Sequence, residues 1–402
     1  MEKKQKFEVV RLRNKKPTYT LSHIVRERYP TFADAVRDLD DCLSMLFLFA
    51  TFPKSVVKEE LIQESRRLTI EFMNYIIASR SLRKVFISIK GYYYQADICG
   101  EKVTWLVPHK FPFERPNGVD FKIMATFVEF YNVMMSFVNC KLYHSINLVY
   151  PPKLINQSSA DTSYDEDQLA AMTVALQTTV SADPAEETAD KEANQLLPQM
   201  LLGSDDKDEA SKLEQELNSM DELSQLFVGK KFYLNREVPR EAIVFVIRSF
   251  GGSVSWDATD GKPGATFGES DQGITHQIVD RPNYDCKNAL TRAYIQPQWV
   301  FDCVNARKLI AVDDYLPGAT LPPHSSPFAM PSVGVPSEME IEDDEQMAQK
   351  QEEPEEVPPA LKKKRRALLK EALAGNTVVE DANVLFSHLP VFLNFIFIII
   401  FT

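Results

Sequence analysis

Apolar residues recur at helical spacing in three stretches near the start of the chain. The first stretch begins at Thr31, which with Asp34 resembles a capping box, and it continues until Pro53. Similar stripes predict helices over about 56–77 and about 121–148. Between these two helices, β-rich runs separated by single glycines predict a small meander: 85–89, 92–96 and 103–107. Residues 1–155 are therefore expected to form a mainly helical domain with a β insert.

A second domain is predicted over 227–328, where short β-branched runs alternate with helical patterns. Four runs are typical of strands: 231–234, 254–256, 274–279 and 294–295. An apolar helix over 241–248 follows the first run, and a helix from about 297 to 309 closes the domain. The pattern predicts an α/β fold.

Three residues are expected to shape this second domain: Gly251, Gly252 and Trp299. The two glycines follow the first helix, and glycine adopts the left-handed backbone that ends many helices. Trp299 lies on the apolar face of the closing helix and is expected to fill the core.

The segments between and after the two domains are acidic and poor in large apolar groups. Residues 156–210 are expected to form a disordered linker, because few apolar side chains cannot offset the entropy of ordering the chain. Ser211 and Glu214 then form a capping box, and a leucine-rich stripe predicts a lead-in helix over 211–226. Residues 329–402 are expected to form a mostly disordered tail.

Charge is divided unevenly along the chain. The net charge is −12, yet residues 1–153 contain 24 Lys and Arg against 16 Asp and Glu, whereas 154–226 contain 3 against 17. A basic segment in an acidic protein is typical of a surface that meets phosphate. The first domain is therefore the candidate for nucleic-acid binding.

The candidate RNA-binding residues are four cations and three tyrosines around the β insert. They are Arg80, Arg83, Lys84, Lys90, Tyr92, Tyr93 and Tyr94. Cations neutralise phosphate, and aromatic rings stack on unpaired bases. The alternative is that the tyrosines pack the β insert while the cations are merely solvated, since alternation along a strand buries at least one tyrosine.

Signals for catalysis, cofactors or metals are weak. The five cysteines are widely spaced without a CxxC pair, and the six histidines show no metal-ligand spacing. Asp38, Asp40 and Asp41 form a carboxylate cluster, a feature that is usually solvated on a helix. We expect neither catalytic residues nor a cofactor or metal, and so not an enzyme.

Five consecutive cations interrupt the acidic tail: Lys362, Lys363, Lys364, Arg365 and Arg366. Such a run is typical of a nuclear import signal or an RNA-binding patch, and the alternative is the solvated start of a basic helix. The final apolar run, 391–401, is shorter than the roughly 18–20 residues that a membrane helix needs. No membrane span is expected.

Long motifs give the chain a resemblance to a known family. They lie at 29–41, 88–96, 150–154, 275–282 and 321–324. The layout of 227–328, with its Gly-Gly turn and its late tryptophan, resembles a BRCT domain, which implies a four-stranded parallel sheet. Taken together, the two domains resemble the pescadillo family of ribosome-biogenesis factors.

The resemblance implies a noncatalytic nucleolar scaffold of the particle that becomes the large (60S) ribosomal subunit. Such proteins are needed to process precursor rRNA around the second internal transcribed spacer, which matures 5.8S and large-subunit rRNA and supports cell proliferation. The implied partners are precursor rRNA within pre-60S particles and two WD-repeat proteins, one of the block-of-proliferation type. The implied location is the nucleus, in nucleolus and nucleoplasm.

Both ends of the chain differ from this family. The family carries a further basic region ahead of the position that Met1 matches, and residues 384–402 do not resemble its C-terminus. We therefore expect a chain that is short at its N-terminal end and has an atypical, aberrant C-terminus.

A protein of a different class is the alternative, namely a BRCT adaptor that reads phosphopeptides in DNA repair or cell-cycle control. BRCT domains that read phosphate tend to carry Ser or Thr followed by Gly after the first strand, where this chain has Asn235 and Arg236. An asparagine amide can still donate, and Arg236 can supply charge. The motifs of the first domain favour the ribosome-biogenesis interpretation.

Overall fold

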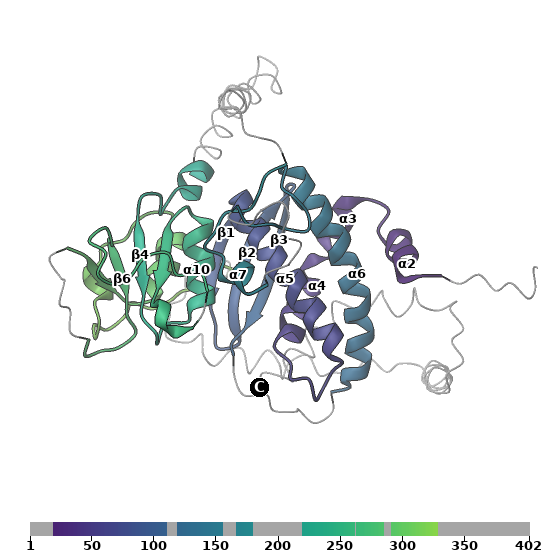
Figure 1. Cartoon of the computed structure of the whole chain (residues 1–402), viewed down its shortest axis with the longest axis horizontal. Coiled ribbons are helices and arrows are strands. Elements are labelled where there is room, and N and C mark those ends of the chain that lie inside the picture. The colour runs from purple at the N-terminus through teal and green to yellow at the C-terminus, as the bar shows by residue number, and fades with distance from the viewer. Residues whose placement is uncertain are drawn as a thin grey trace, which may run out of the picture. The chain divides into compact units, whose positions relative to one another are not determined.

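A computed structural model describes residues 19–110, 119–155, 166–179, 219–261, 263–284 and 291–328 (Figure 1). The chain divides into two compact units, Met1–Pro327 and Phe328–Thr402. Every described residue except Phe328 belongs to the first unit, which contains both predicted domains. The basic run from Lys362 to Arg366 and the apolar run 391–401 lie outside the described residues.

Residues 19–155, here called the head, are mainly helical, as predicted. The helices are α2 (Leu21–Arg28), α3 (Phe32–Arg37), α4 (Leu39–Ala50), α5 (Glu59–Ser79) and α6 (Phe121–Ser145). The oxygen of Thr31 accepts a hydrogen bond from the backbone N–H of Asp34, which confirms the cap. The single helix predicted up to Pro53 is divided into α3 and α4, because Asp38 leaves helical geometry (φ −91°, ψ 11°).

The β insert is an antiparallel meander, which confirms that prediction. Its strands β1 (Leu82–Ile87), β2 (Gly91–Ile98) and β3 (Glu101–Pro108) pair in the order β1-β2-β3. The buried ring of Trp105 on β3 meets Phe72 of α5 edge-on, with 5.2 Å between centroids. The sheet is thus joined to the helices by an aromatic core.

Side chains of α4 cap the free edge of β3. The Asp40 carboxylate accepts from the Thr104 N–H at 3.1 Å, and the Ser44 hydroxyl accepts from the Leu106 N–H at 3.2 Å. Residues four apart on a helix share one face, so the pair meets two backbone donors that would otherwise lack partners. The carboxylate cluster is therefore not simply solvated as predicted, because Asp40 is half-buried and burial raises its pKa to about 6.

Replacing the neighbouring Asp41 with asparagine is expected to stabilise the protein at neutral pH but not near pH 4. Burial, together with the charges of Asp40 and Asp38, raises the pKa of Asp41 to about 6 from an ordinary 3.8. Above pH 6 the folded state holds the ionised form at a cost, and this cost fades as the pH falls towards 4. The shift is equivalent to about 3 kcal/mol, and because Asp41 is only partly buried we expect a gain of about 1 kcal/mol.

Urea unfolding of Asp41→Asn at about pH 7.5 and about pH 4 measures this effect. Glu129→Gln, at an exposed site on α6, is the matched control and is expected to change neither value. An equal gain at both pH values would show that charge burial is not the cause.

The second domain is an α/β unit with four parallel strands, as predicted. Its elements are β4 (Lys231–Leu234), α10 (Arg240–Ser249), β5 (Ser253–Trp256), η1 (Ala258–Asp260), β6 (His276–Ile278), β7 (Ala293–Ile295), α11 (Gln298–Ala306) and η2 (Asp313–Tyr315). The strand order is β5-β4-β6-β7, and every pair is parallel. Trp299 of α11 is 1% exposed and fills the core, as expected.

Gly251 and Gly252 are required for different reasons. Gly251 has a left-handed backbone (φ +83°) just after α10, as predicted. Gly252 does not need this conformation, but a Cβ atom there would lie 2.5 Å from Cγ2 of Ile247 and 3.0 Å from Cβ of Phe227. The second glycine therefore provides space for close packing rather than a left-handed turn.

Candidate RNA and protein interfaces

The predicted RNA-stacking tyrosines lie largely inside the protein. Tyr94 is 1% exposed and meets Phe245 of α10 edge-on, with 4.9 Å between centroids. Tyr92 is half-buried and stacks on Phe301 of α11 at 6.0 Å. Because protein rings cover Tyr92 and Tyr94, the alternative interpretation, in which tyrosines pack the insert, holds for both. Tyr93 is partly exposed and lies 6.4 Å from Phe86.

The four predicted cations are not gathered into one exposed patch. Arg83 is partly buried, donates to the carbonyl oxygens of Arg80 and Leu82, and has a pKa lowered by burial. Arg80 ends α5 in a left-handed conformation (φ 50°). The Lys84 ammonium donates to the Pro327 carbonyl at 3.1 Å. Lys90 lies in the hairpin between β1 and β2, so only part of the predicted cluster is open to RNA.

The outer edge of β1 is capped by an asparagine of α11. The Asn305 amide donates from Nδ2 to the Val85 carbonyl at 2.8 Å, and its Oδ1 accepts from the Val85 N–H at 3.3 Å. One side chain thus satisfies both backbone groups of an edge-strand residue, as a neighbouring strand would. This contact joins the head to the BRCT-like domain.

His324 caps the next outward-facing position of the same edge. Its Nε2 accepts from the Ile87 N–H at 3.1 Å, and its ring stacks on Phe86 with 5.0 Å between centroids and 11° between planes. The other nitrogen, Nδ1, lies 2.7 Å from Oδ1 of Asp302 in α11. Since Nε2 must accept, Nδ1 carries the proton and donates to Asp302. The Leu-Pro-Pro-His motif at 321–324 therefore straps the BRCT-like domain to the head.

Removing Asn305 or His324 is expected to loosen this junction. We expect Asn305→Ala and His324→Ala each to cost about 1–2 kcal/mol, because each leaves backbone donors of β1 unsatisfied. The two sites hold neighbouring positions of one strand, so their effects should couple by about 0.5–1 kcal/mol. Urea unfolding of both single variants and the double variant measures the coupling.

Hydrogen exchange localises the effect. The amides of Val85 and Ile87 should exchange about tenfold faster in the double variant, while amides of β3 remain protected. Lys308→Ala, at an exposed site just after α11, is the control. Unchanged exchange at both amides would contradict the capping role.

Part of the predicted linker also contacts both domains. Residues 166–179 contain the helix α7 (Glu166–Ala171), so the expectation of a disordered linker does not hold there. The Leu169 carbonyl accepts from the Asn74 amide of α5 at 3.0 Å, and the Met172 carbonyl accepts from Arg248 of α10 at 3.2 Å. Leu169 and Met172 are buried, so a few apolar residues suffice because two domains offer them a surface. The lead-in helix is described only over 219–224.

The position at which phosphate-reading BRCT domains bind their ligand is occupied by internal contacts. Asn235 accepts from the buried Gln277 amide at 2.9 Å and donates to Glu237 at 3.3 Å. Arg236 donates to Asp257 at 2.6 Å and to Thr259 at 2.7 Å. Both residues that sequence analysis considered for phosphate binding are thus engaged within the domain.

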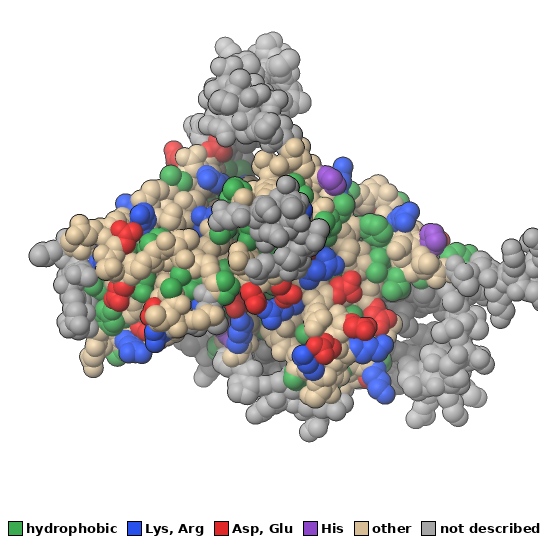
Figure 2. All heavy atoms as spheres, in the orientation of Figure 1, with side chains coloured by type: hydrophobic (Ala, Val, Ile, Leu, Met, Phe, Trp, Pro, Cys, Tyr) green, Lys and Arg blue, Asp and Glu red, His purple; other side chains and the backbone are tan. Residues whose placement is uncertain are grey.

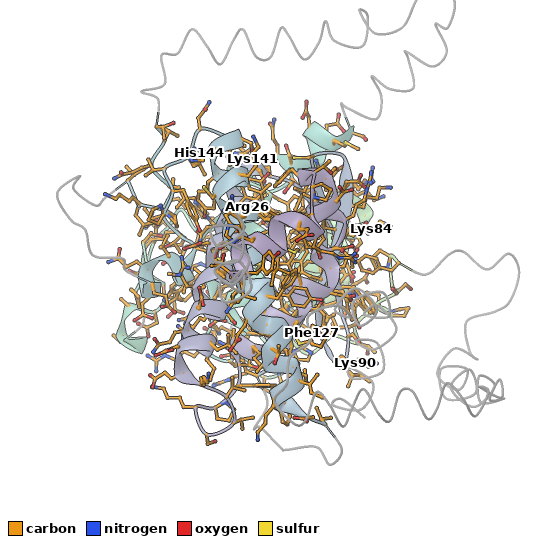
Figure 3. All side chains as sticks on the ribbon, turned by 90° about the vertical axis from the view of Figure 1, so that its right-hand side faces the viewer. Arg26, Lys84, Lys90, Phe127, Lys141 and His144 are labelled. Carbon is orange, nitrogen blue, oxygen red and sulfur yellow. The ribbon has the colours of Figure 1, made fainter. Side chains whose placement is uncertain are left out.

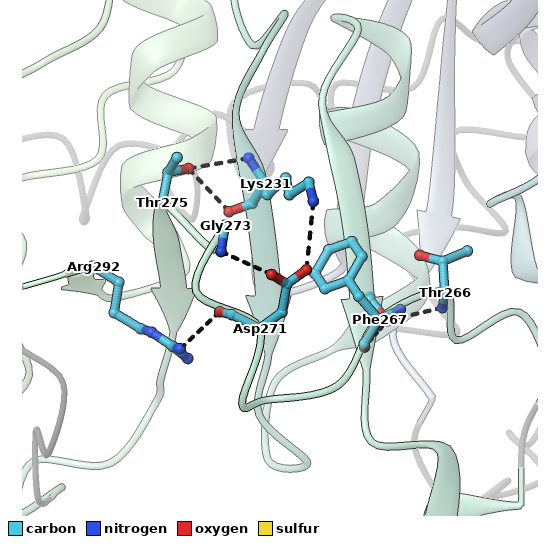
Figure 4. Close-up of polar contacts among 8 residues, drawn as sticks. Lys231, Thr266, Phe267, Asp271, Gly273, Thr275 and Arg292 are labelled. Carbon is cyan, nitrogen blue, oxygen red and sulfur yellow. Dashed lines mark hydrogen bonds and ion pairs between the residues drawn. The ribbon is translucent and has the colours of Figure 1, made fainter.

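The loop before β6 is held by a second set of internal charges (Figure 4). The Asp271 carboxylate accepts from the Gly273 N–H at 2.8 Å and pairs with the Lys231 ammonium at 3.4 Å, which lowers the pKa of Asp271. Arg292, 5% exposed, donates to the Asp271 carbonyl and to Gln277. These charges stabilise the loop rather than form an open anion site.

A cavity of about 840 Å³ lies between the head and the BRCT-like domain. Its aromatic lining includes Tyr92, His109 and Trp256, and the Arg240 guanidinium lies 4.7 Å from the Trp256 ring centroid. Three further lining cations form ion pairs: Lys110 with Glu241, Arg236 with Asp257 and Arg66 with Glu166. The cavity is part of the junction, and much of its positive charge is neutralised.

Two general signals were sought in the part of the chain that the structure describes. There, no group of three or more His, Cys, Asp or Glu side chains is placed to hold a metal ion. One described helix, α6, is long and apolar enough to cross a membrane by length and composition alone. Its buried face, including Met135 and Leu142, packs within the head, as expected for a core helix.

Known proteins resemble the chain in both domains. The family model of the Pescadillo N-terminus matches residues 1–188, and that of the BRCT domain matches residues 225–316. The second BRCT domain of XRCC1 matches at 19% identity and a TM-score of 0.19, covering 24% of this chain and 92% of that structure. A likeness at this TM-score adds nothing to the assignment.

Curated relatives named Pescadillo homolog match most of the chain. The Xenopus tropicalis protein is 49% identical over 339 residues, which is 81% of this chain and 57% of the relative. The Xenopus laevis protein is 50% identical over 80% of this chain and 56% of its own length, and the Culex quinquefasciatus protein is 50% identical over 78% and 52%. The chain spans a little over half the length of these relatives. With both domains matched and half of the aligned residues identical, the chain belongs to the pescadillo family.

Proposed function

We propose that this chain is a noncatalytic scaffold in the biogenesis of the large (60S) ribosomal subunit. In this role it is required for processing precursor rRNA around the second internal transcribed spacer, and so for maturing 5.8S and large-subunit rRNA. The observation that carries the proposal is the near 50% identity with Pescadillo homologues over about four-fifths of the chain.

The junction supports a scaffold rather than a free adaptor domain. Asn305 and His324 bind the edge of β1, and residues 166–179 contact both domains. A body joined in this way presents one fixed surface to a large particle. The internal contacts of Asn235 and Arg236 leave the phosphopeptide alternative without support from the geometry.

Precursor rRNA within pre-60S particles and the two WD-repeat proteins are the proposed partners, in nucleolus and nucleoplasm. For RNA contact, Lys90 and Tyr93 are the most accessible of the predicted residues. Residues 1–18 contain seven of the 24 Lys and Arg in 1–153, but only two of the 16 acidic residues. We therefore expect that segment to supply much of the phosphate contact.

Complementation tests the function. In cells depleted of their own Pescadillo homologue, expression of this chain is expected to lower the level of spacer-containing precursor and restore 5.8S rRNA, measured by northern blotting. Ultraviolet crosslinking of the tagged chain should recover spacer-containing precursor. An expressed and folded chain that leaves the precursor unprocessed would contradict the proposal, whereas rescue without crosslinks would remove only direct RNA contact.

A further inference from the structure

The outer side of α6 exposes apolar side chains that the core does not use. Phe137 is 43% exposed and Ile123 is 51% exposed, and Leu21 of the adjoining α2 is 40% exposed. Large exposed apolar groups gathered on one face mark interaction sites, whereas single ones are ordinary. Figure 2 shows hydrophobic, basic and histidine side chains intermixed on the side where α6 and α2 lie.

The spacing along α6 aligns these groups with cations. At 100° per residue, Ile123, Phe137, Lys141 and His144 fall within about 60° of the helix circumference. Ile123 and Phe137 are separated by about 21 Å along the axis, which is four turns. We call the surface formed by Leu21, Arg26, Ile123, Phe137, Lys141 and His144 the α2/α6 face.

One end of the α2/α6 face is positively charged. Arg26 of α2 lies over the Phe137 ring at 5.5 Å, and Lys141 and His144 are exposed in the last turns of α6. Figure 3 shows Arg26, Lys141 and His144 grouped near this end, with Phe127 towards the other. Residues 133–145 contain no Asp or Glu, and Glu27 is the single acidic residue of α2. The opposite end has Asp120 and the exposed Glu129, so the charge is confined to one end.

The cations alone do not require a partner, because they also neutralise the negative C-terminal end of α6 itself. The exposed Phe137 and Ile123 are not explained in that way. Leu21 and Ile123 are aliphatic and cannot stack on bases, which favours a protein over RNA as the occupant. An apolar stripe four turns long is the length at which an amphipathic helix docks through side chains at i, i+3, i+4 and i+7.

We propose that the α2/α6 face binds an amphipathic helix of a partner protein, about four turns long, whose acidic residues lie at one end. Its apolar stripe covers Ile123 and Phe137, and its acidic end lies over Arg26 and Lys141. Burying Phe137 supplies affinity, whereas the charged end fixes the direction in which the helix lies. This site goes beyond the scaffold function proposed above, and its test does not depend on ribosome biogenesis.

Selection from a peptide library tests the proposal with the full chain. A phage library of helix-forming peptides of about 20 residues is selected on the wild-type chain, with counterselection on the Ile123→Ser/Phe137→Ser double variant. Enriched sequences are expected to combine a helical apolar stripe with Asp and Glu at one end. Enrichment of basic or uncharged sequences, or no enrichment that depends on the two residues, would overturn the proposal.

The most enriched peptide is then synthesised, and its affinity is measured by fluorescence anisotropy. Phe137→Ala and the Arg26→Glu/Lys141→Glu double variant are each expected to bind it about tenfold more weakly, and a peptide with Lys at the acidic positions should bind the charge-reversed chain better than wild type. Ile89→Ala is the matched control, since Ile89 is 91% exposed but lies on the β1–β2 hairpin.

The same variants separate the other occupants. If a single-stranded uridine RNA bound wild type and lost affinity in the Phe137 and charge-reversal variants while the peptide did not, the face would be an RNA site and the proposal would be wrong. If wild type self-associated in analytical ultracentrifugation and Phe137→Ala did not, the occupant would be a second copy, again contradicting it. Thermal melting verifies that each variant is folded, as expected for changes at exposed positions.

Discussion

Trp299→Ala is expected to destabilise the BRCT-like domain by about 4 kcal/mol, because it opens a large cavity in a closed core. The Trp299 ring is 1% exposed, lies 5.1 Å from the His276 ring and packs near Phe232 and Phe227. Its indole N–H donates to the Ile310 carbonyl at 3.1 Å, so the change also leaves that carbonyl without this donor. Such a loss is a large part of the 5–15 kcal/mol that typically stabilises a domain.

Urea unfolding followed by circular dichroism measures this loss. Trp299→Phe retains most of the ring and is expected to cost about 1–2 kcal/mol, which separates the cavity from the lost hydrogen bond. The Asn305 contact with Val85 starts from the same helix, so Trp299→Ala should also speed amide exchange at Val85. A cost below about 1 kcal/mol would mean that the core closes over the missing ring.

Local pattern predicted the elements of both domains because each has a clear period. The β insert alternates, the glycine at position 251 ends α10, and the apolar face of α11 places Trp299 inward. The break at Asp38 was missed because apolar residues continue through it on both sides. Spacing shows which residues are apolar, but not where the backbone changes direction.

The candidate site was harder to predict because its contacts join distant parts of the chain. Alternation along β2 separates its two faces, but it does not show that Phe245 and Phe301 cover Tyr94 and Tyr92. Asn305 meets Val85 across 220 positions, and His324 meets Ile87 across 237. The 321–324 motif was the one signal of that strap in the sequence, and it had no assigned role.

Residues 166–179 show a related limit of composition. Their acidic character predicts disorder for an isolated segment, yet Leu169 and Met172 are buried where the segment crosses the two domains. Composition measures what a segment can bury by itself. Surfaces offered by other domains lie outside that measure.

Glu71 is a further residue that spacing did not single out, and its removal is expected to have an effect as large as that of Trp299. It lies on the buried face of α5 and is 0% exposed. Its carboxylate accepts from Arg67 at 2.9 Å, from the Tyr150 hydroxyl at 3.0 Å and from the Asn139 amide at 3.4 Å. Burial raises the pKa of Glu71, and these three partners oppose the rise. Its partners come from α5, α6 and the segment after α6, so the residue links three parts of the head.

Glu71→Ala is expected to destabilise the head by about 3–5 kcal/mol, because it leaves the Arg67 charge and two buried donors without their acceptor. Glu71→Gln preserves the shape and one acceptor oxygen, so a smaller cost of about 1–2 kcal/mol is expected. Urea unfolding measures both values, with Glu64→Ala as the matched control. Glu64 is an exposed carboxylate of the same helix that accepts from Asn132 at 3.4 Å, and its removal should cost less than about 1 kcal/mol. If Glu71→Ala cost no more than Glu64→Ala, the buried carboxylate would not be what holds α5 to α6, and apolar packing around Phe72 would have to account for the join.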